Sequence, residues 1–314
     1  MSETLFLPDQ PMDQARCIAV YESLREVMPP SVSKTTVRGE KLRDFFHDLD
    51  AVLLDGYGVL NIGADVVPGV EEMLAAAQGA DVAVMVLTNG GSRPTRSAGA
   101  KYRSLGLSLD DRQVVSSRDA LEDWLRHASP PGLTIGVADS FCTTPDLDRH
   151  HFVALTPDAP DRWTEVDVIA FFGAVNWDYR WQSALEDAVR EGVRLLVANP
   201  DVAAPHPGAF SFEPGYWVAS LTAIPRDQVR WFGKPYAPVF DLALQKLEEW
   251  TGRSNLKRER IAMVGDSLHT DILGGNAAGL KTVLVTDHGM FREGGVEAAM
   301  KTSGISPDVI VKTV

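Results

Sequence analysis

Several polar side chains suited to phosphate or metal chemistry each follow a short apolar segment of this chain. The apolar runs before them, such as residues 51–54, are typical of strands buried on both faces of a parallel sheet. Because the carboxyl ends of parallel strands meet at one edge of the sheet, we expect these side chains to lie close together. They are Asp55, Thr88, Asn89, Lys234, Asp266 and Asp271.

The residue types indicate a magnesium-assisted reaction at phosphorus. Asp55 and Asp266 would form a hard oxygen site, which Mg²⁺ prefers together with water and phosphate oxygens. Thr88, Asn89 and the N–H groups at the start of a helix suit the remaining phosphate oxygens, and Lys234 would offset developing negative charge. Asp55 is then the candidate nucleophile, forming an aspartyl-phosphate. Taken singly, each feature is explained as well by a helix cap or a surface turn.

Strand and helix patterns alternate along the chain in two interleaved blocks. Residues 41–110 and 231–314 are predicted to form a Rossmann-like α/β core, and residues 111–230 an inserted α/β cap. Residues 1–40 are predicted to form an N-terminal extension, with a helix over residues 11–28 that ends at two prolines. Further helices are expected over residues 70–79, 179–191 and 238–251, and strands over residues 81–87, 134–138, 152–155, 166–172, 193–197, 228–232, 260–264, 282–285 and 308–311.

The composition restricts the classes of partner. The 314 residues include 30 Lys and Arg against 43 Asp and Glu, which gives a net charge of −13. Nucleic acids and anionic membranes require a basic face, so neither is an expected partner. Two cysteines, Cys17 and Cys142, make no disulfide framework. Neither a signal peptide nor a membrane span is recognisable. These features favour the cytoplasm and leave homo-oligomer formation open.

The order of the motifs resembles that of the haloacid dehalogenase superfamily. The segment GDSLHTDILGGNAAGLKTVLV, residues 265–285, is similar to the class IIA, NagD-like phosphatase subgroup, which carries a large α/β cap between its second and third motifs. Asn199-Pro200-Asp201 looks like a motif of the same type of cap, and the resemblance covers about residues 41–314. The four motifs are the Asp55 loop, Thr88-Asn89, Gly233-Lys234-Pro235 and the segment from Gly265-Asp266 to Asp271.

This resemblance implies a magnesium-dependent phosphohydrolase with a Rossmann-like core and a C2-type α/β cap. Its substrate would be a small phosphorylated metabolite such as a sugar phosphate or a nucleotide. The implied site residues are Asp55 as nucleophile and metal ligand, Asp266 and Asp271 at the metal, Thr88 and Asn89 at the phosphate, Lys234 as charge stabiliser, and Asn199 and Asp201 on the cap side.

One position departs from the pattern of the family. Its phosphatases carry a second aspartate two residues after the nucleophile, as general acid and base, and this chain has Tyr57 there. The backbone carbonyl of Tyr57 can still bind the metal. Its phenol, with a reference pKa near ~10, is a poor proton shuttle at neutral pH. We therefore expect reduced general-acid catalysis and a preference for good leaving groups.

The residues leave two other functions open. A tyrosine at position 57 also resembles the 2-haloacid dehalogenases of the superfamily, which attack carbon without a metal. Against this, Asp266 and Asp271 belong to the metal-binding type of fourth motif. The second alternative is a regulatory protein that binds metal and phosphate without turnover.

The segment 199–215 is rich in Pro, Gly and His and is predicted to be a loop facing the ligand or the other domain. His206 in this segment is interpreted either as a substrate contact or as an ordinary loop histidine. Tyr216 and Trp217, which follow it, could line the substrate opening, and His269 is expected to be a spacer within the fourth motif.

Overall fold

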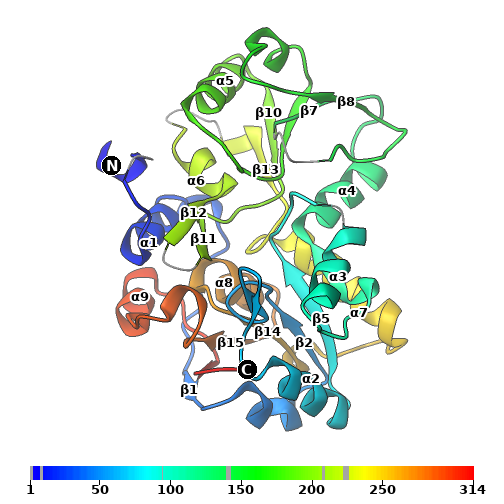
Figure 1. Ribbon diagram of the computed structural model, residues 1–314, viewed down its shortest axis with the longest axis vertical. Helices are drawn as coiled ribbons and strands as arrows, with labels where there is room; N and C mark the ends of the chain where they lie inside the picture. The colour runs from blue at the N-terminus through cyan, green and yellow to red at the C-terminus, as the bar shows by residue number, and fades with distance from the viewer. Residues whose placement is uncertain (1–2, 8–9, 94, 139–142, 207–208, 222–225) are drawn as a thin grey trace.

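Two parallel β-sheets, one of seven strands and one of five, form the two lobes of the molecule (Figure 1). The computed structural model describes residues 3–7, 10–93, 95–138, 143–206, 209–221 and 226–314. Cys142 lies outside these residues, and Cys17 is buried with a free thiol. Within the described ranges, no helix has both the length and the apolar character needed to span a bilayer.

The larger sheet is parallel throughout, and its central strands have no exposed residue. This burial agrees with their unbroken apolar sequences, because a strand covered on both faces needs no polar residues on either side. In spatial order the strands are β1 (Val37–Arg38), β16 (Val309–Val311), β15 (Lys281–Val285), β14 (Ile261–Gly265), β2 (Ala51–Leu54), β5 (Ala83–Thr88) and β6 (Val114–Ser116).

Helices cover both faces of the larger sheet. Leu54 of β2 belongs to a buried cluster with residues of α2 (Val70–Gly79) on one face. Leu53 belongs to a second cluster, on the other face, with residues of α4 (Ser117–His127) and α7 (Ala237–Thr251). Successive residues of one strand therefore enter opposite halves of the core. The remaining helices of this lobe are α3 (Thr95–Ser104), α8 (Leu273–Ala277) and α9 (Val296–Ser303).

The smaller sheet is also parallel and carries its own helices and an antiparallel hairpin. In spatial order its strands are β13 (Val229–Trp231), β10 (Arg194–Val197), β9 (Val168–Phe171), β7 (Thr134–Val137) and β8 (His151–Ala154). The other elements are α5 (Tyr179–Arg190), α6 (Pro214–Ala219), the hairpin β11 (Ala203–His206) with β12 (Ala209–Phe212), and a short hairpin beside Asp55, β3 (Asn61–Ile62) with β4 (Asp65–Val66).

The sheet pairings differ from the sequence prediction at three places. β13, which precedes Lys234, pairs with β10 in the smaller sheet and not with the strands of the core. β6 pairs with β5 in the larger sheet, although residues 111–230 were assigned to the cap. The expected loop 199–215 contains the hairpin of β11 and β12. We propose from these pairings that the inserted cap starts after α4 and ends with β13.

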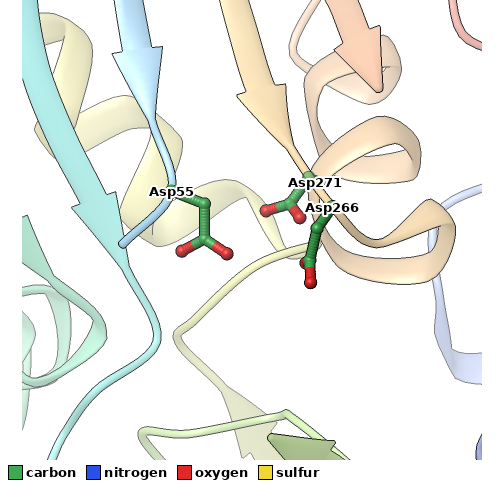
Figure 2. Close-up of side chains that lie close together, drawn as sticks. All are labelled: Asp55, Asp266 and Asp271. Carbon is green, nitrogen blue, oxygen red and sulfur yellow. The ribbon is translucent and has the colours of Figure 1, made fainter. Parts of the chain in front are cut away.

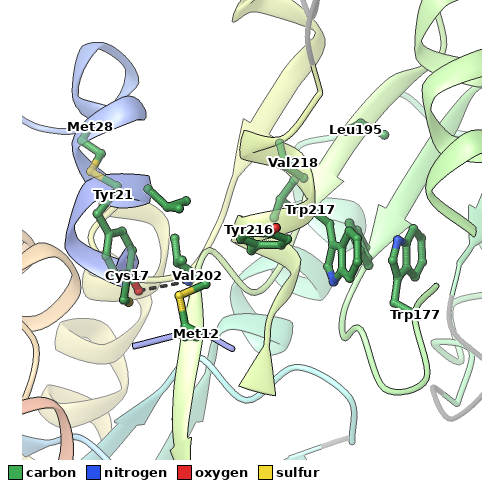
Figure 3. Close-up of a cluster of buried hydrophobic side chains, with 14 of the residues drawn as sticks. Met12, Cys17, Tyr21, Met28, Trp177, Leu195, Val202, Tyr216, Trp217 and Val218 are labelled. Atoms are coloured by element: carbon green, nitrogen blue, oxygen red, sulfur yellow. Dashed lines mark hydrogen bonds between the residues drawn. The ribbon is translucent and has the colours of Figure 1, made fainter. Parts of the chain in front are cut away.

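The N-terminal segment packs at the junction of the two lobes (Figure 1). Its helix α1 (Gln14–Ser23) begins at Asp13, whose side chain accepts a hydrogen bond from the backbone N–H of Arg16. Residues of α1 share one buried cluster with residues of both lobes, including Trp217 of the cap and Leu268 of the core (Figure 3 shows part of it). Met12 and the buried residues of α1 are therefore part of the core between the lobes. β1, predicted within the extension, is an edge strand of the larger sheet.

Replacement of Leu53 by alanine should lower the free energy of unfolding by about 3 kcal/mol, because it removes buried methyl groups and leaves a cavity in the central strand. Chemical denaturation followed by circular dichroism measures this change. Val32→Ala, at a side chain that is 46% exposed, is the matched control and should change the value by less than about 0.5 kcal/mol. Equal effects of the two substitutions would contradict the assignment of β2 to the centre of the core.

Candidate active site

Three aspartates meet at the carboxyl edge of the larger sheet (Figure 2). Asp55 directly follows β2, and Asp266 directly follows β14. Asp271 lies in the π-helical turn Leu268–Ile272, a few residues later. One carboxylate oxygen from each of the three lies within 4.8 Å of the others. The parallel sheet thus brings together side chains that are more than two hundred residues apart in the chain.

The ammonium group of Lys234 lies between two of these carboxylates. Its Nζ is 2.7 Å from Asp55 Oδ1 and 2.7 Å from Asp271 Oδ1. Burial alone would lower the pKa of Lys234, but the negative charges of Asp271 and Asp55 raise this pKa well above its ordinary value. The lysine is therefore a fixed positive charge beside Asp55.

The backbone closes tightly around Asp266. Its Oδ2 accepts a hydrogen bond of 2.8 Å from the backbone N–H of Met290. Gly58 and Gly289 both have a left-handed φ of +76°. A Cβ would lie 2.4 Å from Asp266 Oδ2 at Gly58 and 1.9 Å from it at Gly289. Only glycine fits at these two positions. The backbone of two separate loops therefore packs directly against this carboxylate.

The chemistry of this cluster fits a divalent cation. Among the described residues of the cluster, three carboxylates face one lysine, which leaves an excess of negative charge. Burial, together with the charges of Asp271 and Asp55, raises the pKa of Asp266 well above its ordinary value. A bound cation relieves such repulsion, and carboxylate oxygens are the ligands that Mg²⁺ takes in proteins. Asp55, Asp266 and Asp271 are the residues that would hold it.

Asn89 links Lys234 to the cap through its side-chain amide. Its Oδ1 accepts a hydrogen bond of 2.7 Å from the backbone N–H of Lys234, and its Nδ2 donates to the carbonyl of Lys234 and to Asp201 Oδ1. Ser117 Oγ donates to the backbone carbonyl of Asn89. Because the amide of this buried residue is engaged on both sides, its side chain positions Lys234 and Asp201. The neighbouring Thr88 Oγ1 accepts a hydrogen bond from Gly90 N–H.

Asp201 and Asn199 lie in the loop that follows β10. Asn199 Oδ1 accepts from the backbone N–H of Asp201, and Asn199 Nδ2 donates to Glu213 Oε2 at 3.1 Å. Asn199 is thus a buried support of the loop, whereas Asp201 faces Asn89 across the lobes. Burial raises the pKa of Asp201 to about 7, although the charge of Lys234 and the hydrogen bond from Asn89 act in the opposite direction.

Tyr57 lies between the core and the cap. Its ring meets the ring of His206, on cap strand β11, edge to face with centroids 5.6 Å apart. The Nζ of Lys101, on α3, lies 5.1 Å from the centre of the Tyr57 ring and 5.2 Å from that of Tyr102. Burial raises the pKa of Tyr57 above its ordinary value. His206 lies on a strand and not in a loop, and its contact with a substrate stays a prediction.

Several neighbours of the site could not be read from the sequence. Lys101 and Tyr102 belong to no recognisable motif. His269, predicted to be a spacer, is buried and stacks on Tyr21 of α1. The suggestion that Tyr216 and Trp217 line the substrate opening is wrong, because both side chains are buried in the cluster between the lobes (Figure 3).

Two protein-family models match the chain. One, described as haloacid dehalogenase-like hydrolase, matches residues 52–143, and one described as HAD-hydrolase-like matches residues 231–314. The matched parts contain all three aspartates of the cluster and Lys234.

The curated relatives with similar sequences include phosphatases. A dihydroxyacetone phosphatase of Corynebacterium glutamicum is 26% identical over 233 residues, which are 74% of this chain and 79% of the relative. The ribonucleotide monophosphatase NagD of Escherichia coli is 28% identical over 234 residues, which are 74% of this chain and 86% of the relative.

Solved structures share the fold. A p-nitrophenyl phosphatase from Archaeoglobus fulgidus superposes with a TM-score of 0.67 at 20% identity, covering 85% of this chain and 97% of the other. A glycerol phosphate phosphatase from Mycobacterium tuberculosis in complex with magnesium superposes with a TM-score of 0.58 at 21% identity, covering 77% of this chain and 68% of the other. The likeness includes both lobes, since it extends over most of this chain.

The raised pKa of Asp201 predicts a pH-dependent effect of Asp201→Asn on stability. A carboxyl whose pKa is about 7 in the folded state and 3.8 in the unfolded state is penalised once it ionises, so its contribution to stability falls between these values as pH rises. The variant keeps an oxygen that can accept from Asn89 and removes the charge. Its melting temperature relative to wild type should therefore rise by roughly 2–6 °C between pH 5 and pH 8.

Thermal unfolding at the two pH values tests this prediction. Asp65→Asn, at an exposed carboxylate of β4, is the control and should show no such trend. A difference between Asp201→Asn and wild type that stays constant with pH would contradict a raised pKa of this carboxyl.

Proposed function

This chain belongs to the haloacid dehalogenase-like hydrolases, in their NagD-like phosphatase subgroup, and we propose that it is a magnesium-dependent phosphatase that acts through an aspartyl-phosphate on Asp55. The observation that carries this proposal is the group of three aspartates with Lys234 at the edge of the sheet. Asp55 keeps 13% of its side chain exposed, whereas Asp271 has none. Asp55 is therefore the carboxylate that a substrate can reach.

In the proposed reaction a carboxylate oxygen of Asp55 attacks phosphorus, and the bond from phosphorus to the leaving oxygen breaks. Lys234, whose Nζ contacts Asp55, offsets negative charge on the phosphoryl group during transfer. Magnesium, when bound at the three carboxylates, would supply further positive charge to the phosphate oxygens. Water then hydrolyses the acyl phosphate, which releases phosphate and restores the Asp55 carboxylate.

Thr88, with the backbone N–H groups of the turn after β5, is proposed to hold the phosphate oxygens, because a helix follows this turn and its free N–H groups suit an anion. Asn89 contributes by holding the backbone of Lys234. Asp201 is proposed to face the substrate from the cap side, where its hydrogen bond to Asn89 joins the two lobes.

Tyr57 is proposed to limit the protonation of the leaving group. Its phenol is already protonated at neutral pH because its ordinary pKa is about 10, and burial raises this pKa further, so the phenol is a weak general acid. Lys101 beside the ring brings a second positive charge to this side of the site. Leaving groups that depart as stable anions, such as the aryloxide of an aryl phosphate or the carboxylate of an acyl phosphate, therefore suit the site better than alkoxides.

The substrate is proposed to be a small phosphorylated metabolite. The two curated relatives above are named for dihydroxyacetone phosphate and ribonucleotide monophosphates. No haloacid is implied, because the chain keeps the two later aspartates in a cluster suited to a cation.

Asp55→Asn should reduce the hydrolysis of p-nitrophenyl phosphate by at least about 10³-fold, because the amide cannot attack phosphorus. The measurement is the release of nitrophenolate with magnesium and with EDTA, and wild-type activity should require the metal. Asp65→Asn is the control and should keep full activity. Activity retained in Asp55→Asn would exclude the aspartyl-phosphate. A wild type that binds magnesium without turnover would favour the regulatory alternative, and halide release from 2-haloacids without metal would favour a dehalogenase.

Tyr57→Asp should restore general-acid catalysis. We expect kcat for an alkyl phosphate such as glycerol phosphate to rise by about 10-fold or more, with a much smaller gain for p-nitrophenyl phosphate, whose leaving group needs no proton. Tyr57→Asn is the control, because asparagine has the size of aspartate but no carboxyl group. It separates the effect of the acid from the effect of removing the tyrosine ring. Equal gains in the Asp and Asn variants would show that steric relief, and not proton transfer, limits the wild type.

A further inference from the structure

Helix α1 contacts the loops that carry the active-site aspartates and the cap loop that carries Asp201. We propose that Gln14, Tyr21 and Glu22 of this helix are positioning residues of the active site, which hold the metal-binding carboxylates and the cap loop in their working arrangement. The inference rests on the proposed function and extends it to a part of the chain that precedes both segments matched by the family models, the first of which begins at residue 52.

Tyr21 touches both lobes with a single side chain, and Figure 3 shows it beside Val202 of the cap. Its ring stacks on His269 with centroids 4.9 Å apart and an interplanar angle of 5°. Its hydroxyl oxygen accepts a buried hydrogen bond of 3.1 Å from the backbone N–H of Val202. His269 lies between Asp266 and Asp271 in the chain, and Val202 directly follows Asp201. Tyr21 therefore bridges the metal loop and the cap loop.

Glu22 strengthens the contact with the metal loop. Its Oε1 lies 2.6 Å from His269 Nε2, while Tyr21 covers the face of the same imidazole. His269 belongs to the π-helical turn that also contains Asp271. Tyr21 thus restricts this turn by stacking on the face of the imidazole, and Glu22 restricts it by contacting the edge of the ring.

Gln14 supports Asp266 from the other side. Its Nε2 donates to the carbonyl of Met290 at 2.8 Å and to that of Gly294 at 3.0 Å. The backbone N–H of Met290 is the donor to Asp266 Oδ2. The loop that clamps Asp266 is therefore itself tied to α1, and outer contacts of this kind orient metal ligands.

The position of α1 is secured by burial and by Arg16. Cys17 and Val20 are fully buried in the cluster between the lobes. The guanidinium of Arg16 donates to the hydroxyl of Tyr216 at 2.9 Å and to the carbonyl of Leu7 at 2.7 Å. Because α1 is anchored in this way, its side chains can hold the loop of Asp271 and the loop of Asp201 in place.

Gln14→Leu and Tyr21→Phe test the inference, since each removes hydrogen bonds to a loop and keeps the bulk of the side chain. Ser23→Ala is the control on the same helix, because the partner of Ser23 Oγ among the described residues is the carbonyl of Val20 within the helix. Magnesium binding by isothermal titration calorimetry is measured first, without substrate. Gln14→Leu should weaken it by about 10-fold, and Ser23→Ala should leave it unchanged.

Steady-state hydrolysis of p-nitrophenyl phosphate and melting temperatures complete the test. Gln14→Leu should lower kcat at fixed magnesium, and Tyr21→Phe, which frees the cap loop at Val202, should raise KM. A lowered melting temperature with unchanged magnesium affinity, kcat and KM would show a purely structural helix and would overturn the inference.

The two proposals fail separately. A wild type that binds magnesium without hydrolysing any phosphate ester would overturn the proposed function, and weaker magnesium binding in Gln14→Leu would still support the role of α1. Full hydrolysis together with unchanged magnesium affinity and KM in all variants would sustain the function and overturn the positioning role.

Discussion

The buried ammonium group of Lys234 constrains the arrangement of both lobes. An unpaired charge at such a depth would cost several kcal/mol, and the carboxylates of Asp55 and Asp271 remove that cost by contacting Nζ at 2.7 Å each. Asp55 and Asp271 lie in segments that follow strands of the larger sheet, whereas Lys234 follows a strand of the smaller one. Asn89, which bonds to the backbone of Lys234 and to Asp201, extends the link into the cap. The same contacts therefore determine both the geometry of the aspartate cluster and the placement of the cap.

The surroundings of Tyr57 differ from those of Asp55 and Lys234. The proposed nucleophile and its charge stabiliser depend on buried ion pairs, which tolerate no change. The leaving-group side depends on the contact of Tyr57 with His206 from the cap and with Lys101 from α3. Position 57 thus lies at a boundary between elements, where the large ring of Tyr57 packs against His206 and Lys101.

The features that could be predicted from the sequence are those that depend on short apolar patterns along the chain. The apolar runs predicted β2 and β14, and the rule that parallel strands share an edge predicted the meeting of Asp55 with Asp266. The predicted helix over residues 70–79 has the observed bounds. By contrast, β13 has three residues and no pattern that specifies which sheet it joins. The contact of Tyr21 with His269 depends on packing between remote segments, which one sequence does not encode legibly.

The N-terminal helix also has a consequence for the order of assembly. Glu22 and Gln14 are synthesised well before their partners, which lie 247 and 276 positions later in the chain. Docking of α1 on these partners must wait until residues 269–290 have been synthesised, and closing so long a loop is slow. Until then the apolar face with Val20 is exposed and prone to association. The contacts of α1 with the loops of the aspartate cluster are thus completed only after His269 and Met290 have been synthesised.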